Sequence, residues 1–232
     1  MVIFVSNTKI KIFNLMRKQF LNILTVVAIS VALVGCKKAK EAETTTAEEV
    51  AETPSVATKY KVDTEASSIT WKGYKPTGSH NGTIAVESGV INMKDDAIQS
   101  GTFLIDMNSI VVKDIPAEDE GNAKLAGHLK SPDFFDVEKY PSAAFSITEF
   151  KTVEGKSTLS GNLKMKDAEN NITIPVTVTE NGNTVSIKSE TFTIDRSKWN
   201  VKYGSKSFFD DLGDKFINDE FELQVNIVGN KS

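Results

Sequence analysis

The chain has 232 residues, of which 40% are hydrophobic and 25% are charged, and this composition suits one substantial folded domain. The net charge is −4 and Lys and Arg form no long run, which argues against nucleic-acid binding because that function usually requires a basic face. Cys36 is the only cysteine, so the fold cannot depend on a disulfide framework.

The first 36 residues have the pattern of a bacterial secretory signal. A basic pair, Arg17-Lys18, precedes a largely apolar run over residues 21–34, which is short for a membrane span of about 20 apolar residues. The run ends in Leu-Val-Gly-Cys, which resembles the lipobox of bacterial lipoproteins, where cleavage precedes a lipidated cysteine. We expect a signal peptide over residues 1–35, with Met16 as a candidate true start, and a diacylglyceryl group on Cys36. The alternative is an uncleaved signal anchor with an incidental cysteine.

The segment that follows Cys36 has the composition of a linker. Ala, Glu, Thr and Lys dominate it as far as about Thr58, and large apolar residues are almost absent. Such a segment buries too little apolar surface to offset the entropy lost on ordering. We therefore expect a lipidated cysteine and flexible tether over residues 36–58, with a reach on the order of 25 Å.

From Tyr60 onward the sequence is a series of short segments in which apolar and polar residues alternate. In residues 101–112, for example, Phe103, Ile105 and Met107 fall on one face and Leu104 falls on the other. This alternation predicts an all-β domain, an antiparallel sandwich or barrel. The expected strands cover residues 68–74, 82–93 with a turn at Ser88-Gly89, 101–112, 143–153, 157–166, 173–179, 184–188 on either side of an Asn181-Gly182 turn, 190–195 and 220–228.

Two stretches depart from the strand pattern. In residues 118–130, Leu125 and Leu129 are spaced by four and Ser131-Pro132 follows, which predicts a short helix. Residues 208–216 are expected to form either a helical turn or a loop. The domain should therefore carry one or two short helices.

The strand pattern also suggests an apolar interior. An antiparallel barrel of about eight strands either fills its lumen with side chains or holds one small ligand, and the sequence leaves both alternatives open. The chain has 13 Phe against 2 Trp and 4 Tyr. Phenylalanine suits an apolar cavity because it brings no polar group that must be satisfied, although each Phe can equally be ordinary core.

Catalytic motifs do not stand out. The sequence has two histidines, His80 in a turn-like segment and His128 on the expected helix, and it lacks His-Glu-x-x-His, Gly-x-Ser-x-Gly and a glycine-rich phosphate loop. Structural hydrogen bonding is favoured over metal binding for both histidines. We therefore expect no enzyme activity, no metal and no cofactor other than a possible bound lipid.

Residues 125–141 carry the most specific pattern in the chain. They contain a helix end at His-Leu, then Ser-x-Asp-Phe-Phe-Asp and a Tyr-Pro pair, with Phe145 on the next strand. This series is similar to the hallmark of the YceI-like family. Trp71 and segments within residues 80–89, 101–110, 160–163, 192–205 and 217–221 match the family in the same order, so the resemblance covers about residues 60–228.

The resemblance implies a lipocalin-like antiparallel β-barrel over residues 59–230 that binds a polyisoprenoid in an apolar lumen. It also implies a non-catalytic protein outside the cytoplasm, although many members are soluble in the periplasm and the lipobox departs from that pattern. Arg196 is expected either to form a structural ion pair near Asp195 and Trp199 or to hold a ligand phosphate or quinone oxygen. The expected lumen residues are Trp71, Phe103, Ile105, Met107, Leu125, Leu129, Phe134, Phe135, Phe145, Leu163 and Trp199, and the expected head-group contacts are His80, His128 and Arg196.

Together these patterns predict a membrane-tethered lipid-binding protein of the cell envelope of a Gram-negative bacterium, on the periplasmic or outer-membrane face. Its expected partners are a long-chain isoprenoid or other apolar lipid, and the membrane through acylated Cys36. The alternative is a structural or interaction lipoprotein whose barrel is filled by side chains and holds no ligand.

Overall fold

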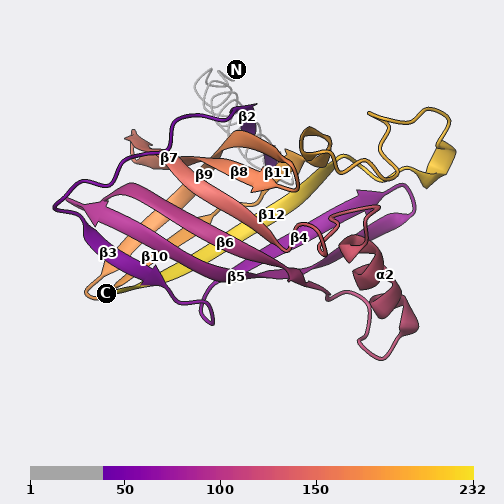
Figure 1. Ribbon diagram of the computed structural model, residues 1–232, viewed down its shortest axis with the longest axis horizontal. Helices are drawn as coiled ribbons and strands as arrows, with labels where there is room; N and C mark the ends of the chain where they lie inside the picture. Colours follow the sequence, from indigo (N-terminus) through magenta and orange to yellow (C-terminus); the bar gives the residue numbers. More distant parts are fainter. Residues whose placement is uncertain (1–38) are drawn as a thin grey trace, which may run out of the picture. The chain divides into compact units, whose positions relative to one another are not determined.

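A closed ring of eight antiparallel strands forms the body of the protein (Figure 1). The computed structural model describes residues 39–232, so the expected signal peptide and Cys36 lie outside the described part. Within this part, no helix is long and apolar enough to cross a membrane. The ring runs through β4 (Ser68–Lys75), β5 (Gly78–Lys94), β6 (Ala97–Val112), β7 (Ser142–Val153), β8 (Lys156–Met165), β9 (Ala168–Asn181), β10 (Thr184–Ser189) and β12 (Glu220–Lys231), which pairs with β4.

Shorter elements complete the ring and its ends. β3 (Thr58–Val62) pairs with β5 and β12, and β11 (Phe192–Asp195) pairs with β12. The helix α2 (Glu120–Lys130) lies at the right-hand end of the barrel in Figure 1, whereas β3 and the C-terminus lie at the opposite end. The remaining elements are β1 (Lys40–Glu41), β2 (Glu43–Thr46) and two 3₁₀ turns, η1 (Arg196–Trp199) and η2 (Gly213–Lys215).

The alternation read from the sequence sets the two faces of the barrel wall. Phe103 and Met107 on β6 are buried inside, whereas Leu104 between them is 36% exposed. The same alternation in the other ring strands gathers Ile, Val, Leu and Phe side chains into one core cluster. The expected antiparallel barrel is confirmed.

Two turn predictions need correction. The turn expected at Ser88-Gly89 is absent, because β5 continues through both residues with a register shift between Val86 and Ser88. Gly89 serves a close approach instead, since a Cβ there would lie 2.8 Å from Cδ1 of Phe103 on β6. The hairpin between β9 and β10 turns at residues 182–183, one residue later than expected, with Gly182 at a φ of 60°.

The predictions for the two non-strand stretches agree with the structure. α2 forms within the predicted range, and the side chain of Asp119 caps its first turn by accepting a hydrogen bond from the Gly121 N–H. Residues 208–216 are mostly loop, with the short 3₁₀ turn η2 near their end.

The expected tether is ordered where the structure describes it. β1 pairs in parallel with β11, and β2 pairs antiparallel with residues 170–173 of β9. β9 pairs with β10 only from Val176 onward, so its first half offers a free edge that β2 fills. Residues 40–46 thus form a wall strand between β9 and β11, with Ala42 buried in the core cluster. The prediction of a flexible segment was wrong for residues 40–46. Composition reports only the side chains, whereas this segment is held by backbone hydrogen bonds to the free edges of β9 and β11.

We call residues 39–57 the strap, because after β2 they continue across the outside of the barrel to β3 (Figure 1). The Asn162 side chain on β8 accepts a hydrogen bond from the Glu48 N–H at 3.0 Å and donates one to the Glu48 carbonyl at 2.7 Å. Thr53 bonds the Ser100 hydroxyl at 2.6 Å. Ser100 and Asn162 face outward from their strands, yet both are only 4% exposed because the strap covers them.

Candidate functional site

The barrel encloses an apolar lumen with a cavity of about 120 Å³. Its walls are side chains from the inward faces of the ring strands, and Ser189 is the only polar residue among the lining residues that the structure describes. None of these described lining residues is ionisable, so the lumen offers a ligand only apolar contacts and one hydroxyl group. The lining includes the predicted residues Phe103, Ile105, Met107, Phe135, Phe145 and Leu163.

Glycines shape the wall beside the largest side chains of the lumen. The Phe145 ring on β7 occupies the place where a Cβ on Gly161 of β8 would stand. Its centroid lies 6.3 Å from that of Phe103 on the neighbouring strand. The absence of a side chain at Gly161 therefore lets an aromatic ring lie close to the wall and leaves space further inside.

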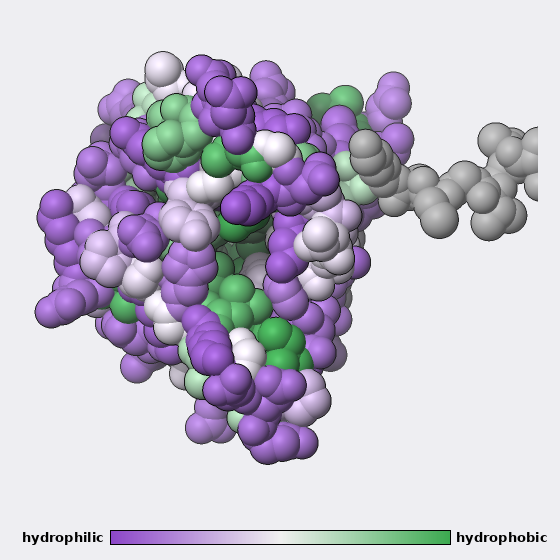
Figure 2. Space-filling model, turned by 90° about the vertical axis from the view of Figure 1, so that its right-hand side faces the viewer, coloured by the Kyte–Doolittle hydropathy of each residue, from purple (hydrophilic) through white to green (hydrophobic). Residues whose placement is uncertain are grey.

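A second cavity of about 210 Å³ forms the mouth of the barrel next to α2. Ile84, Phe135 and Phe221 line both cavities, so the mouth and the lumen adjoin. Figure 2 views this end of the molecule and shows a hollow with hydrophobic residues inside a largely hydrophilic rim. The predicted residues Trp71, Leu125, Leu129, Phe134, His80 and His128 line the mouth.

The two histidines at the mouth have different surroundings. His80 belongs to β5, opposite Gly73, and not to a turn as expected. Its Nδ1 lies 2.8 Å from Oδ2 of Asp114, whose Oδ1 accepts a hydrogen bond from the Asn81 N–H. Burial raises the pKa of the Asp114 carboxyl, but the bonds from Asn81 and His80 outweigh it and hold this pKa below the usual value.

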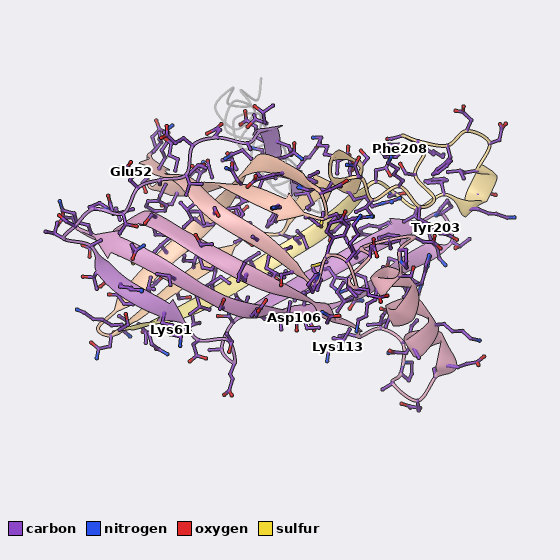
Figure 3. All side chains as sticks on the ribbon, in the orientation of Figure 1. Glu52, Lys61, Asp106, Lys113, Tyr203 and Phe208 are labelled. Carbon is purple, nitrogen blue, oxygen red and sulfur yellow. The ribbon has the colours of Figure 1, made fainter. Side chains whose placement is uncertain are left out.

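His128, by contrast, lies among aromatic rings. Its ring contacts Tyr203 and Phe134 edge-on, with centroid distances of 4.5 and 5.9 Å. His128 therefore joins α2 to Tyr203 in the loop after η1, on one side of the mouth (Figure 3).

Arg196 has the structural role that was one of its two expected alternatives, with Asp219 and not Asp195 as its ion-pair partner. The Arg196 guanidinium donates hydrogen bonds to the carbonyls of Val201, Ile217 and Asn218 at 2.6–3.1 Å and lies 3.2 Å from Asp219. Burial lowers its pKa, and its side chain is only 2% exposed. Arg196 thus holds the loop that returns to β12, and this geometry does not fit the expected head-group contact.

Trp199 is fully buried and lines neither cavity. Its indole N–H donates to the Leu163 carbonyl at 2.8 Å, which fastens η1 against β8. Its expected place in the lumen is therefore wrong, whereas the other ten predicted lumen residues line the mouth, the lumen or both.

Several cavity residues were not named from the sequence. Strand alternation would have found most of the lumen residues, because they are the inward apolar positions of expected strands. Tyr74, Ile110 and Ile217 at the mouth carry no such signal. Tyr74 and Ile110 are out of phase with the inward positions of their strands, and Ile217 lies in a loop. Within residues 39–232, no group of three or more His, Cys, Asp or Glu side chains is placed to hold a metal ion. The lumen residues missed are Ile69, Ile84, Val86, Ala143, Leu159, Met165, Ile172, Ile174, Val176, Ile187, Ser189, Phe192, Ile194, Phe221, Leu223, Val225 and Ile227.

Known proteins share this fold and part of this sequence. The chain is 39% identical over 62 residues to a UPF0312 protein of Photorhabdus laumondii and 30% identical over 135 residues to one of Yersinia enterocolitica. These matches cover 27% and 55% of this chain, and they span 30% and 65% of the length of those curated relatives.

Solved structures agree on the architecture. BcnA of Burkholderia cenocepacia superposes with a TM-score of 0.56 at 22% identity, covering 72% of this chain and 98% of BcnA. A polyisoprenoid binding domain from Saccharophagus degradans, implicated in plant cell wall breakdown, has a TM-score of 0.55 at 12% identity and covers 75% and 98% of the two chains. At these identities the likeness shows the fold alone. The family model of the YceI-like domain, however, matches residues 60–229, which is most of the chain, and the protein therefore belongs to the YceI-like family.

Proposed function

We propose that this protein binds a long apolar lipid of the polyisoprenoid class, with the chain in the lumen and one end at the mouth. The observation that carries the proposal is a lumen with apolar walls that adjoins an open mouth. Membership of the YceI-like family supports it, as does the fold shared with a domain described as polyisoprenoid binding.

Apolar burial can supply the affinity without charged contacts. Each buried CH₂ group contributes about 0.8 kcal/mol, so a prenyl chain that fills a preformed lumen gains substantial binding free energy. The protein in this proposal holds or carries the lipid and does not transform it, because the described lining residues of the lumen include no ionisable side chain that could act as an acid or base.

The proposal also includes a tether outside the cytoplasm. Its support is the signal-like start and the lipobox-like residues that end at Cys36. The protein would then work in the cell envelope, close to the membrane that contains its ligand.

Replacing Cys36 by Ser should move the protein from the membrane fraction to the soluble fraction, and unchanged membrane association would contradict lipidation.

Two neighbouring alanines on β7 give a matched test of lipid binding. Ala143 lines the lumen, whereas Ala144 faces the opposite side of the strand. Ala143→Phe should fill the cavity and abolish recovery of lipid in organic extracts of the natively purified protein, measured by mass spectrometry. Ala144→Phe should retain the lipid, and circular dichroism should show both variants folded.

The alternative of a side-chain-filled barrel without a ligand makes a different prediction. The wild-type protein would then yield no lipid in extracts and would bind no prenyl lipid on reconstitution. That result would contradict the proposed function.

A further inference from the structure

The loop of residues 202–216, which we call the aromatic loop, exposes apolar rings to solvent. It lies between η1 and β12 at the mouth end of the barrel, where Figure 3 labels Tyr203 and Phe208. Tyr203, Phe208 and Phe209 are 40–50% exposed, and they are the only exposed aromatic side chains among residues 39–232. Exposed apolar surface concentrated in one segment marks an interaction site.

Hydrogen bonds fix the backbone that carries these rings. The Ser205 carbonyl accepts hydrogen bonds from the N–H groups of Phe208 and Phe209 at 3.2 and 3.0 Å, which closes a tight turn. The Ser207 hydroxyl donates to the Asp219 carboxylate at 2.7 Å. Ser205 is fully buried, so the base of the turn is held in the fold while the rings that follow it point outward. The exposure of the rings is therefore built into the structure.

The aromatic loop borders the mouth. The Tyr203 ring lies 4.5 Å from that of His128, which lines the mouth cavity. Ile217, directly after the loop, lines the same cavity, and its N–H donates a hydrogen bond back to the start of the loop at 2.8 Å. Phe208 and Phe209 line neither cavity. These two rings are therefore available to contact the source of the ligand while the ligand occupies the lumen.

The beginning of the strap lies next to the same part of the barrel. β1 pairs with β11, and β11 leads directly into η1 and the aromatic loop. The Glu41 carboxylate on β1 lies 3.7 Å from the Lys198 ammonium on η1. In the proposed function a lipid on Cys36, three residues before Ala39, would therefore bring the bilayer to the side of the barrel that carries this loop.

The charges of the aromatic loop indicate what covers it. Residues 202–216 contain three Lys and three Asp, so the loop has no net charge that would select a charged partner. Two of the lysines lie over rings: the Lys202 ammonium is 5.0 Å from the Phe208 centroid, and that of Lys206 is 3.5 Å from the Phe216 centroid. Aromatic rings beside lysines are typical of segments at a membrane surface, where the rings enter the headgroup region and the ammonium groups stay in water.

We propose that the aromatic loop inserts its exposed rings into the surface of a lipid bilayer and so sets the mouth of the barrel against the membrane from which the ligand enters. This inference rests on the proposed function, because a bilayer is the source of a long apolar lipid. Since the charges of the loop balance, insertion should depend little on salt and should occur on zwitterionic phosphatidylcholine. The rings act on the rate of lipid entry and not on the affinity of the lumen.

Tryptophan reporters in the protein reconstituted on vesicles test the contact directly. Phe209→Trp keeps an aromatic ring in the loop, and brominated phosphatidylcholine should quench its added fluorescence. Lys61→Trp is the control, because Lys61 is exposed on β3 at the opposite end of the barrel (Figure 3). Its added fluorescence should be quenched several times less.

Two results of this measurement would overturn the proposal. One is equal quenching of the reporters at positions 209 and 61. The other is a blue-shifted emission from Phe209→Trp that brominated lipid leaves unquenched, since this would show that the loop docks on a second copy of the chain.

The rate of lipid entry gives a functional readout. Phe208→Ser combined with Phe209→Ser should slow transfer of a fluorescent C20 prenyl alcohol from vesicles to the protein about tenfold, because two rings no longer insert. The amount bound at equilibrium should stay the same, since neither ring lines a cavity. Leu104→Ser combined with Val111→Ser is the matched control, because it removes two exposed apolar side chains from β6. It should leave the rate nearly unchanged.

The outcomes separate this inference from the function on which it rests. If the wild-type protein takes up the prenyl alcohol but the loop variant, shown to be folded by circular dichroism, takes it up at the same rate, the docking role of the loop is wrong and the lipid-binding function stands. If the wild-type protein takes up no prenyl lipid, the proposed function fails and the inferred route of entry fails with it.

Discussion

Individual glycines of the wall decide where the aromatic rings of the cavities lie. Gly82 faces Trp71 across the β4–β5 pair, and Gly89 faces Phe103 across the β5–β6 pair. In both cases a Cβ on the glycine would come within 2.8 Å of the ring. Glycine in a strand interior usually weakens the strand, but here the absence of a side chain leaves room for a large neighbouring ring. The rings can therefore lie close to the wall, which keeps the lumen from filling completely.

Gly82 and Gly73 provide a matched pair for testing this role. A Cβ at Gly82 would overlap the Val111 carbonyl oxygen and press on Trp71, whereas a Cβ at Gly73 meets no atom within 4 Å. Gly82→Ala should therefore lower the free energy of unfolding by about 3 kcal/mol, and Gly73→Ala should change it by less than about 1 kcal/mol. Urea unfolding followed by fluorescence would measure both. Equal effects of the two substitutions would contradict the close-approach explanation.

Tyr60 makes the stability of the folded barrel depend on pH in the alkaline range. Its hydroxyl donates a hydrogen bond to the Glu180 carboxylate, and its ring is fully buried. The hydrogen bond is the larger cause and burial the smaller, and together they raise the pKa of Tyr60 to about 12. The unfolded chain has the ordinary tyrosine pKa of about 10 and loses its proton first. The contribution of Tyr60 is therefore fully present below pH 10 and is lost as the pH rises from about 10 to 12.

Unfolding measured between pH 8 and pH 12 should show this loss in the wild-type protein. Tyr60→Phe should flatten the slope between pH 10 and pH 12 because it removes the titrating group. Glu180→Gln should reduce the slope, since it removes the charge that holds the proton on Tyr60. A Tyr60→Phe protein with the same alkaline slope as the wild type would show that other groups cause it.

At the scale of elements, the strap is the part of the fold that departs most from an isolated eight-stranded ring. It fills the wall between β9 and β11, and it contributes mainly backbone, with Ala42 as its buried core residue. The barrel recognises it with polar side chains: the Asn162 amide bonds both polar backbone groups of Glu48 and is itself bonded by Asn171 at 3.0 Å. Backbone recognition of this kind places few demands on the strap sequence, which explains its linker-like composition.

Asn162→Ala tests how the strap is held. The substitution leaves the Glu48 backbone without its partners and should cost about 2 kcal/mol of stability. Hydrogen exchange at the Glu48 N–H should become faster, whereas exchange in β7 should remain slow. Lys164→Ala is the control, because Lys164 lies two residues further along the same outer face and is exposed. Unchanged protection of Glu48 in Asn162→Ala would mean that other contacts hold the strap.

At the scale of the whole molecule, an ordered strap changes what a lipid on Cys36 would do. Only two residues separate Cys36 from Ala39, where the described part begins, so their Cα atoms are at most about 11 Å apart. A tether with a reach on the order of 25 Å would have left the barrel free to turn. If Cys36 is lipidated, the wall that contains the strap should instead stay close to the bilayer.

Fluorescent labels on opposite walls would measure this orientation in the lipidated protein on vesicles. Glu43 is exposed on the strap, and Thr70 is exposed on β4, which lies across the ring from β8, where the strap bonds Asn162. A label at position 43 should be quenched by spin-labelled lipids several times more strongly than a label at position 70. Insertion of a flexible Gly-Ser segment before Ala39 should equalise the two. Equal quenching without the insertion would show that the strap does not orient the barrel.

The sequence by itself determined the strands of the ring, the helix before the Asp-Phe-Phe motif, the inward positions such as Phe103 and Met107, and the family. These are predictable because they depend on local alternation and on an ordered series of motifs. Only the tertiary structure decided the rest. Pairing with two free edges turned a linker-like segment into a wall strand, and carbonyls from distant residues engaged Arg196 and Trp199. The composition of the mouth likewise depends on the tertiary structure, because residues far apart in the chain are brought together there only by closure of the barrel.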